Sequence, residues 1–140
     1  MRLVLDTNVA VSGLLWGGAP AQLLDATQIG EIELFTSPSL LAELAGILAR
    51  VKFAKALAAT GLPREELVLG YAELATIIVP ADIPPTIAAD PDDDQVLACA
   101  LAARADLIVS GDRHLHSLGS YYQGIAIVHP AEALHIIEVG

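Results

Sequence analysis

Residues 2–8 read Arg-Leu-Val-Leu-Asp-Thr-Asn, a short apolar run that stops at an aspartate. Such a run is typical of a buried parallel strand that ends in a loop. The pattern recurs over residues 106–112, Asp-Leu-Ile-Val-Ser-Gly-Asp, where an apolar run again ends just before a carboxylate. In open parallel sheets, sites form beyond the carboxyl ends of the strands. If these two strands are neighbours, Asp6 and Asp112 converge at one rim.

The rest of the chain alternates strand-like and helical patterns. Short apolar runs predict further strands over residues 32–35, 76–79 and 125–128. Helical spacing, with prolines and acids at the starts, predicts helices over residues 19–29, 39–51, 52–59, 64–75, 92–103, 113–118 and 130–136. Prolines mark residues 81–89 as a loop. Strands joined by helices favour an α/β fold, a three-layer α/β/α sandwich around a central parallel sheet.

The length and composition bound the class of protein. The chain has 140 residues, which fits one domain over residues 1–140. Hydrophobic residues make up 54% and charged residues 17%, against about 25% charged in an average soluble domain. This favours a sheet covered on both faces, with apolar surface left for self-association around Leu14-Leu15-Trp16 and the 40–51 helix.

Targeting and membrane segments are not expected. The longest uncharged stretch, residues 7–24, contains Asn, Gln, Pro and three glycines, unlike a bilayer-spanning helix. Only three apolar residues separate Arg2 from Asp6, too few for the core of a signal peptide. The single Cys99 excludes an intramolecular disulfide. We therefore expect a cytoplasmic protein.

The net charge of −10 comes from 17 acidic and 7 basic residues. This balance argues against binding nucleic acid by broad neutralisation of its phosphates. The acids are clustered, with Asp90, Asp92, Asp93 and Asp94 within five positions. Such a cluster is either a solvated helix start or a site for a cation.

Three carboxylates outside this cluster are candidates for the same rim. Asp6 and Asp112 each follow a strand, although each could instead cap a turn or the helix after it. Glu43 stands in the second turn of the helix after the second strand, at the edge of its apolar face. An edge glutamate can also be simply solvated.

The acidic run has its own internal pattern. Asp90 is a candidate cap, and acids in a first turn are favoured by the helix dipole. Four acids exceed what capping requires, and a divalent cation would relieve their repulsion. Asp93 has apolar residues at i+3, i+4 and i+7 and aligns with the buried face, whereas Asp94 is rotated away.

Carboxylates and water are ligands of Mg²⁺ and Mn²⁺, whereas His or Cys would be expected for Zn²⁺. The histidines lack a supporting Cys/His cluster and are interpreted as surface or terminal-helix residues: His114, His116, His129 and His135. Cys99 is interpreted as a buried small residue. The sequence contains no Gly-rich phosphate loop, no G-x-S-x-G motif and no plausible Ser/His/Asp set.

Four motifs in order resemble the PIN-domain family over nearly the whole chain. They are Leu-Asp6-Thr-Asn8, Ser-Pro-Ser-Leu-Leu-Ala-Glu43, Asp90-Pro-Asp-Asp-Asp-Gln-Val-Leu-Ala-Cys-Ala100 and Ala105-Asp-Leu-Ile-Val-Ser-Gly-Asp112. The likeness is strongest to the VapC-like toxin branch of bacterial and archaeal type II toxin–antitoxin systems.

The resemblance implies a set of site residues. It implies that one or two Mg²⁺ or Mn²⁺ ions are bound by Asp6, Glu43, Asp93 and Asp112. It also implies support from Asn8 and Ser110. The family often has Asn at the position of Asp94, and a one-residue shift would exchange Asp94 with Asp93.

The resemblance further implies endonucleolytic cleavage of single-stranded RNA, inhibition by a cognate antitoxin, and homodimerisation. A bound cation would turn an acidic rim into a phosphate site, with candidate RNA-backbone contacts from Arg50, Lys52, Lys55 and Arg113.

Two alternatives remain open at this point. One is a metal-dependent phosphatase of the haloacid-dehalogenase type on a similar sheet, although Asn8 stands where that family has its second acid. The other is a catalytically inactive PIN-like module that binds a protein or RNA through the same rim.

Overall fold

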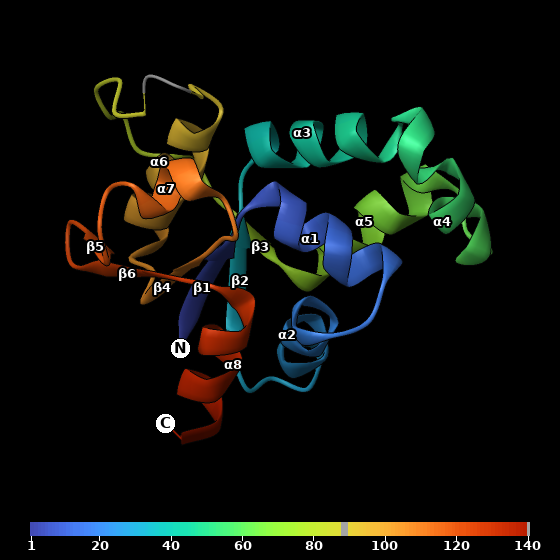
Figure 1. The fold of residues 1–140 in the computed structure, drawn as a ribbon, viewed down its shortest axis with the longest axis horizontal. Coiled ribbons are helices and arrows are strands. Elements are labelled where there is room, and N and C mark those ends of the chain that lie inside the picture. The colour runs from blue at the N-terminus through green and yellow to red at the C-terminus, as the bar shows by residue number, and fades with distance from the viewer. Residues whose placement is uncertain (88–89, 140) are drawn as a thin grey trace.

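The computed structural model of the protein describes residues 1–87 and 90–139 and is built on one six-stranded sheet of order β3-β2-β1-β4-β6-β5 (Figure 1). The strands are β1 (Arg2–Leu5), β2 (Glu33–Thr36), β3 (Thr76–Ile77), β4 (Leu107–Val109), β5 (Tyr121–Tyr122) and β6 (Ile125–Val128). All neighbours pair in parallel except β5, which is antiparallel to β6. The predicted parallel sheet is confirmed, and β5 is an addition to it.

The chain changes direction across the sheet between β1 and β4. From β1 it passes to β2 and β3 on one side, and then to β4 and β6 on the other. Val4 pairs with Phe35 of β2 and with Ile108 of β4. The strands that precede Asp6 and Asp112 are therefore neighbours, which meets the condition for convergence of the two carboxylates, and their carboxyl ends meet at the point where strand order reverses.

Helices cover both faces of this sheet (Figure 1). They are α1 (Thr7–Leu15), α2 (Ala19–Gln28), α3 (Pro38–Leu48), α4 (Ala54–Ala59), α5 (Arg64–Leu74), α6 (Asp93–Ala103), α7 (Arg113–His116) and α8 (Pro130–Val139), with a 3₁₀ turn, η1, at Val51–Phe53. Side chains on β1 alternate between two cores, as a pleated strand requires: Leu3 and Leu5 face α1, α2 and α8, and Val4 faces α6. The three-layer α/β/α prediction is confirmed.

Two helical predictions need correction. The sequence pattern did not predict α1, because Val9, Ala10 and Val11 are buried in succession and leave no polar face to reveal the period. The predicted 39–51 helix ends at Leu48, and Arg50 has an extended backbone. Val51, expected on the apolar face, is 90% exposed.

The segment between β3 and α6 is a loop, as predicted, although β3 is shorter than the predicted 76–79 strand. The predicted loop over 81–89 is seen as far as Ile87, and its last two residues lie outside the described residues. Among the described helices, none has the length and apolar character needed to cross a membrane.

Candidate metal centre

Asp6 and Asp112 are joined through Ser110 at the carboxyl ends of β1 and β4. The buried Ser110 hydroxyl donates to Asp6 Oδ2 at 2.7 Å and accepts from the Asp112 amide at 2.9 Å. Asp6 Oδ1 accepts from the Asn8 amide at 3.4 Å, and Asp112 Oδ1 accepts from the His114 amide at 2.7 Å. Both aspartates therefore cap helices, and the same caps hold their carboxylates at one rim.

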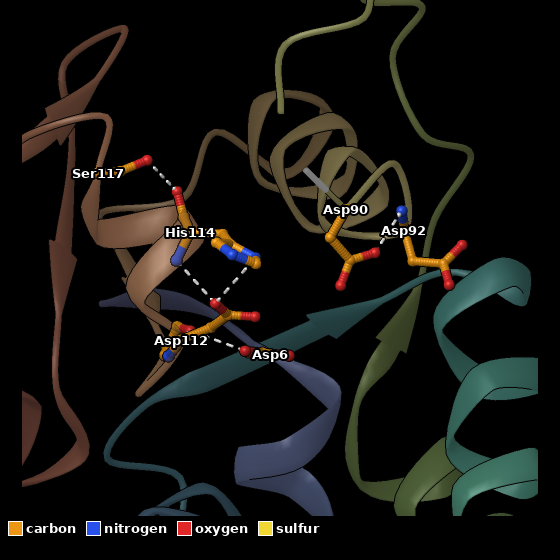
Figure 2. Close-up of polar contacts among 7 residues, drawn as sticks. Asp6, Asp90, Asp92, Asp112, His114 and Ser117 are labelled. Carbon is orange, nitrogen blue, oxygen red and sulfur yellow. Dashed lines mark hydrogen bonds and ion pairs between the residues drawn. The ribbon is translucent and has the colours of Figure 1, made fainter. Parts of the chain in front are cut away.

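Four side chains at this rim come close enough to share one ion. Asp90, Asp93, Asp112 and His114 each offer a ligand atom, and these atoms lie within 4.8 Å of one another. Figure 2 shows three of these residues, Asp90, Asp112 and His114. Ligands on opposite sides of a Mg²⁺ ion are about 4.2 Å apart. The cluster thus has the size and the donor types of a divalent-cation site.

Asp93 gives the strongest sign that a cation belongs there. Its side chain is 6% exposed, and Oδ2 has no hydrogen-bond partner among the described residues. Burial, with repulsion from Asp112, Asp90 and Asp6, raises its pKa to about 8. A buried carboxylate among like charges is unfavourable unless a cation or a proton compensates it.

Asp6 and Glu43 border the cluster and carry the same electrostatic signature. Burial raises the pKa of Asp6, opposed by its bonds to Ser110 and Asn8, while Asp112 raises it further. Glu43, half-buried in the second turn of α3, has its pKa raised by burial and by Asp92, Asp6 and Asp90. The neighbouring Thr7 hydroxyl opposes that rise. All four predicted ligands thus lie at one rim, although Asp6 and Glu43 are not among the four closest side chains.

Asp94 faces away from this rim. Its Oδ1 accepts from the Ile87 amide at 2.8 Å and its Oδ2 from the Thr86 amide at 3.1 Å. Asp90 Oδ1 accepts from the Asp92 amide at 3.1 Å, so Asp90 stabilises the turn before α6. The two adjacent aspartates of the first turn of α6 therefore differ in position: Asp93 faces the cluster, and Asp94 fastens the preceding loop.

Two of the histidines interpreted as surface residues, His114 and His116, are only partly exposed and contact other groups at the rim. His114 lies in the cluster, and His116 Nε2 is 2.6 Å from the Ser110 carbonyl, with its ring stacked 4.0 Å from that of His129. His129 and His135 are exposed. A signal for His114 was available, because an aspartate that caps a helix through the amide two residues later places that residue beside its carboxylate.

A cleft of about 370 Å³ opens next to Asp6 and Asp112. Its other lining residues are Asn8, Val9, Ser12, Pro20, Gly111 and Pro130. They come from α1, the start of α2, the loop after β4 and the start of α8. The rim therefore has room for a ligand directly beside two of its carboxylates.

The predicted RNA contacts fall into two places. Arg113 is exposed at the start of α7, next to Asp112. The other three are exposed and follow the far end of α3: Arg50 directly precedes η1, Lys52 lies in η1 and Lys55 lies in α4. At 1.5 Å per residue, Leu48 at the end of α3 lies roughly 7.5 Å farther along the helix axis than Glu43, and Arg50 follows it.

Comparison with known proteins agrees with this architecture. The PIN domain family matches residues 2–114. The chain is 29% identical over 119 residues to an uncharacterized protein of Methanocaldococcus jannaschii, covering 84% of this chain and 75% of that protein. No solved structure matches at a significant level. PIN domains are generally metal-dependent nucleases, and this one presents a carboxylate cluster that could bind a metal. The family match covers most of the chain, and the α/β/α fold with its rim of carboxylates agrees with it. The chain therefore belongs to the PIN-domain family.

Proposed function

We propose that this protein is a Mg²⁺- or Mn²⁺-dependent endoribonuclease that cleaves single-stranded RNA. The observation that carries the proposal is Asp93, a buried carboxylate with an unpartnered oxygen that faces Asp112 and Asp90 at the switch point of a PIN domain. In its ionised form, such a group is costly in the folded protein without a cation. Its position therefore favours a function that depends on metal.

Each residue of the rim has a role in this proposal. Asp93 and Asp112, with Asp6 and Glu43 beside them, hold the ion, and Ser110 and Asn8 fix the orientation of Asp6. When bound, a divalent ion lowers the pKa of a water and stabilises charge that develops on the phosphate. Hydrolysis in this way leaves a 5′-phosphate and a 3′-hydroxyl.

The acidic chain can still bind RNA in this proposal. The cleft beside Asp6 and Asp112 accommodates a nucleotide next to the scissile phosphate. Arg113 stands next to the same site and can contact a phosphate directly, because its side chain is exposed. The cation and Arg113 thus supply locally the positive charge that the chain as a whole lacks.

The phosphatase alternative gains no support from the site. A phosphatase of this type requires a second acid two positions after Asp6, where this chain has Asn8. Asn8 is exposed, and its backbone N–H donates to Asp6 Oδ1. An inactive binding module would have the same fold as a nuclease, so only an assay of RNA cleavage can distinguish the two.

The decisive test is cleavage of a mixed single-stranded RNA with Mn²⁺ by wild type and Asp6→Asn. The change is nearly isosteric and removes one ligand charge, so we expect a loss of at least about a hundredfold, comparable to removing one strong transition-state contact. Asp25→Asn, an exposed position on α2, is the matched control and should cut like wild type.

Three outcomes would contradict the proposal. Equal cleavage by wild type and Asp6→Asn would place the activity outside this site. Hydrolysis of p-nitrophenyl phosphate that depends on Asp6, without RNA cleavage, would establish the phosphatase. Metal binding without either activity would establish an inactive module.

We also propose that the protein is a cytoplasmic toxin held by a cognate antitoxin, and that it forms a homodimer. Both rest on the motif resemblance, and exposed apolar surface supports the second. Trp16 is half exposed against Phe53, and an open groove between α3 and α5 is lined by Ala45, Val68, Leu69 and Ala72, with Arg64 and Glu65 at one end of α5. The core face of α3 is not available, because Leu44, Ile47 and Leu48 are buried.

These two proposals have separate tests. Expression in bacteria should arrest growth for wild type and not for Asp6→Asn, and unimpeded growth with active wild type would remove the toxin role. Light scattering should show a dimer, and a strict monomer at high concentration would remove homodimerisation.

A further inference from the structure

His114 is the one nitrogen donor in a cluster otherwise made of aspartates. It lies in the first turn of α7, held there because its amide donates to Asp112 Oδ1 at 2.7 Å. The Ser117 hydroxyl donates to its carbonyl one turn later. The backbone of His114 is therefore fixed by the same residue that belongs to the cluster.

The imidazole does not make an ordinary hydrogen bond to its carboxylate neighbour. Nδ1 lies 3.7 Å from Asp112 Oδ1, which is too long for a hydrogen bond. Nδ1 is nevertheless shielded from solvent and has no hydrogen-bond partner among the described residues. A shielded polar atom without a partner requires an explanation, and an absent ligand is one.

A second, independent observation points to the same place. Asp93 Oδ2 comes from a different element, α6, and is also shielded and unpartnered. Asp93 as a residue is more than nine-tenths buried. Two unpartnered atoms, one nitrogen and one oxygen, thus belong to side chains whose ligand atoms lie within 4.8 Å of one another. Figure 2 shows His114 beside Asp112, with Asp90 facing them from the segment before α6.

We infer that His114 Nδ1 is a metal ligand, which makes the centre a mixed carboxylate–imidazole site that prefers Mn²⁺ over Mg²⁺. This inference rests on the proposed metal-dependent function and goes beyond the carboxylate ligands on which that function depends. Both ions suit carboxylates, but Mg²⁺ favours an all-oxygen shell, whereas Mn²⁺ is a first-row transition-metal ion and accepts an imidazole ligand more readily than Mg²⁺ does. Replacing one oxygen ligand with nitrogen therefore penalises Mg²⁺ more than Mn²⁺.

The test is electron spin echo spectroscopy of Mn²⁺ bound to the full chain, because it detects ¹⁴N coupled to the ion. Wild type should show the coupling of a directly bound imidazole. His114→Gln, which keeps a polar side chain with an oxygen donor, should bind Mn²⁺ without it. His135→Gln removes an exposed histidine from α8 and should keep the wild-type spectrum.

Calorimetry gives a second readout that does not depend on activity. The ratio of the Mg²⁺ to the Mn²⁺ dissociation constant should fall at least about tenfold in His114→Gln, the scale on which ligand-shell changes alter affinity. It should be unchanged in His135→Gln.

The outcomes separate this inference from the proposed function. Bound Mn²⁺ without ¹⁴N coupling in wild type, or coupling that persists in His114→Gln, would overturn the role of His114 while RNA cleavage stands. No Mn²⁺ binding in wild type would overturn both the role of His114 and the metal-dependent function.

Discussion

The two ends of α3 carry opposite charges in different surroundings. Near its first turns, Glu43 is half-buried and lies in the field of Asp6 and Asp90. Beyond its last turn, Lys52 and Lys55 are exposed. Charges removed from water interact strongly and acquire altered pKa values, whereas solvated charges act weakly and at a distance. The acidic end of α3 can therefore help to hold a cation, whereas the basic end can attract a polyanion only weakly and from a distance.

The largest expected effect tests whether Asp93, and not the adjacent Asp94, is the functional carboxylate of the acidic cluster. Asp93→Asn should reduce RNA cleavage by at least about a hundredfold, because Asp93 faces the cluster. Asp94→Asn should stay within about tenfold, since Asp94 binds the amides of Thr86 and Ile87 instead. Its main cost should be stability, roughly 1 kcal/mol for one lost hydrogen bond, measured by urea unfolding. A dead Asp94→Asn beside an active Asp93→Asn would reverse the assignment.

The next effect concerns pH. Burial and the neighbouring carboxylates raise the pKa of Asp93 to about 8 in the folded protein, from an ordinary value of 3.8. Between these values the folded state binds more protons than the unfolded state, so this group's contribution to stability is lost as pH rises from about 4 to 8. Mn²⁺ requires the ionised carboxylate. We therefore expect the rise in melting temperature with Mn²⁺ to be larger at pH 8 than at pH 6.

Thermal unfolding at pH 6, 7 and 8, in EDTA and in Mn²⁺, measures this effect. Asp93→Asn is the matched variant and should flatten the pH dependence in EDTA. A Mn²⁺ shift that is equal at all three pH values would mean that the ion does not compete with protons on Asp93.

The smallest effect belongs to the basic end. Lys52→Gln combined with Lys55→Gln should weaken RNA binding a few-fold, and reduce the slope of log affinity against log salt by roughly 1.4 for two lost single-strand contacts. Lys52→Arg with Lys55→Arg keeps both charges and should bind like wild type. An unchanged salt slope in the glutamine pair would show that the RNA path does not reach α4.

The sheet was predictable because its strands are short apolar runs with clear ends. The carboxylates of Asp6 and Asp112 could be placed at one rim because each directly follows a strand. The helix α1 was not predicted, because its successive residues Val9, Ala10 and Val11 are all buried and the sequence therefore shows no amphipathic period there. The end of α3 was predicted too late, because Val51 fits the apolar spacing of the helix. In the structure the helix ends at Leu48, and the extended backbone of Arg50 changes the direction of the chain before Val51.

The local sequence places His114 beside Asp112, two residues after the capping aspartate, but it could not show that Asp90 and Asp93 come close to the same ring. The ring enters the cluster because α7 begins at the same rim as α6, a contact between residues far apart in the chain. The burial of Asp93 also depends on packing of the whole rim. Helical spacing did give the relative orientation of Asp93 and Asp94, since adjacent positions differ by about 100° around a helix.

Both border strands of the sheet are only two residues long, Thr76–Ile77 on one side and Tyr121–Tyr122 on the other. A border strand with so few free amides and carbonyls gives an incoming strand little to pair with. This limits cross-β aggregation in a chain that is 54% hydrophobic. We therefore expect assemblies of this protein to form through its helical surfaces, and not by addition of a partner's strand to the sheet.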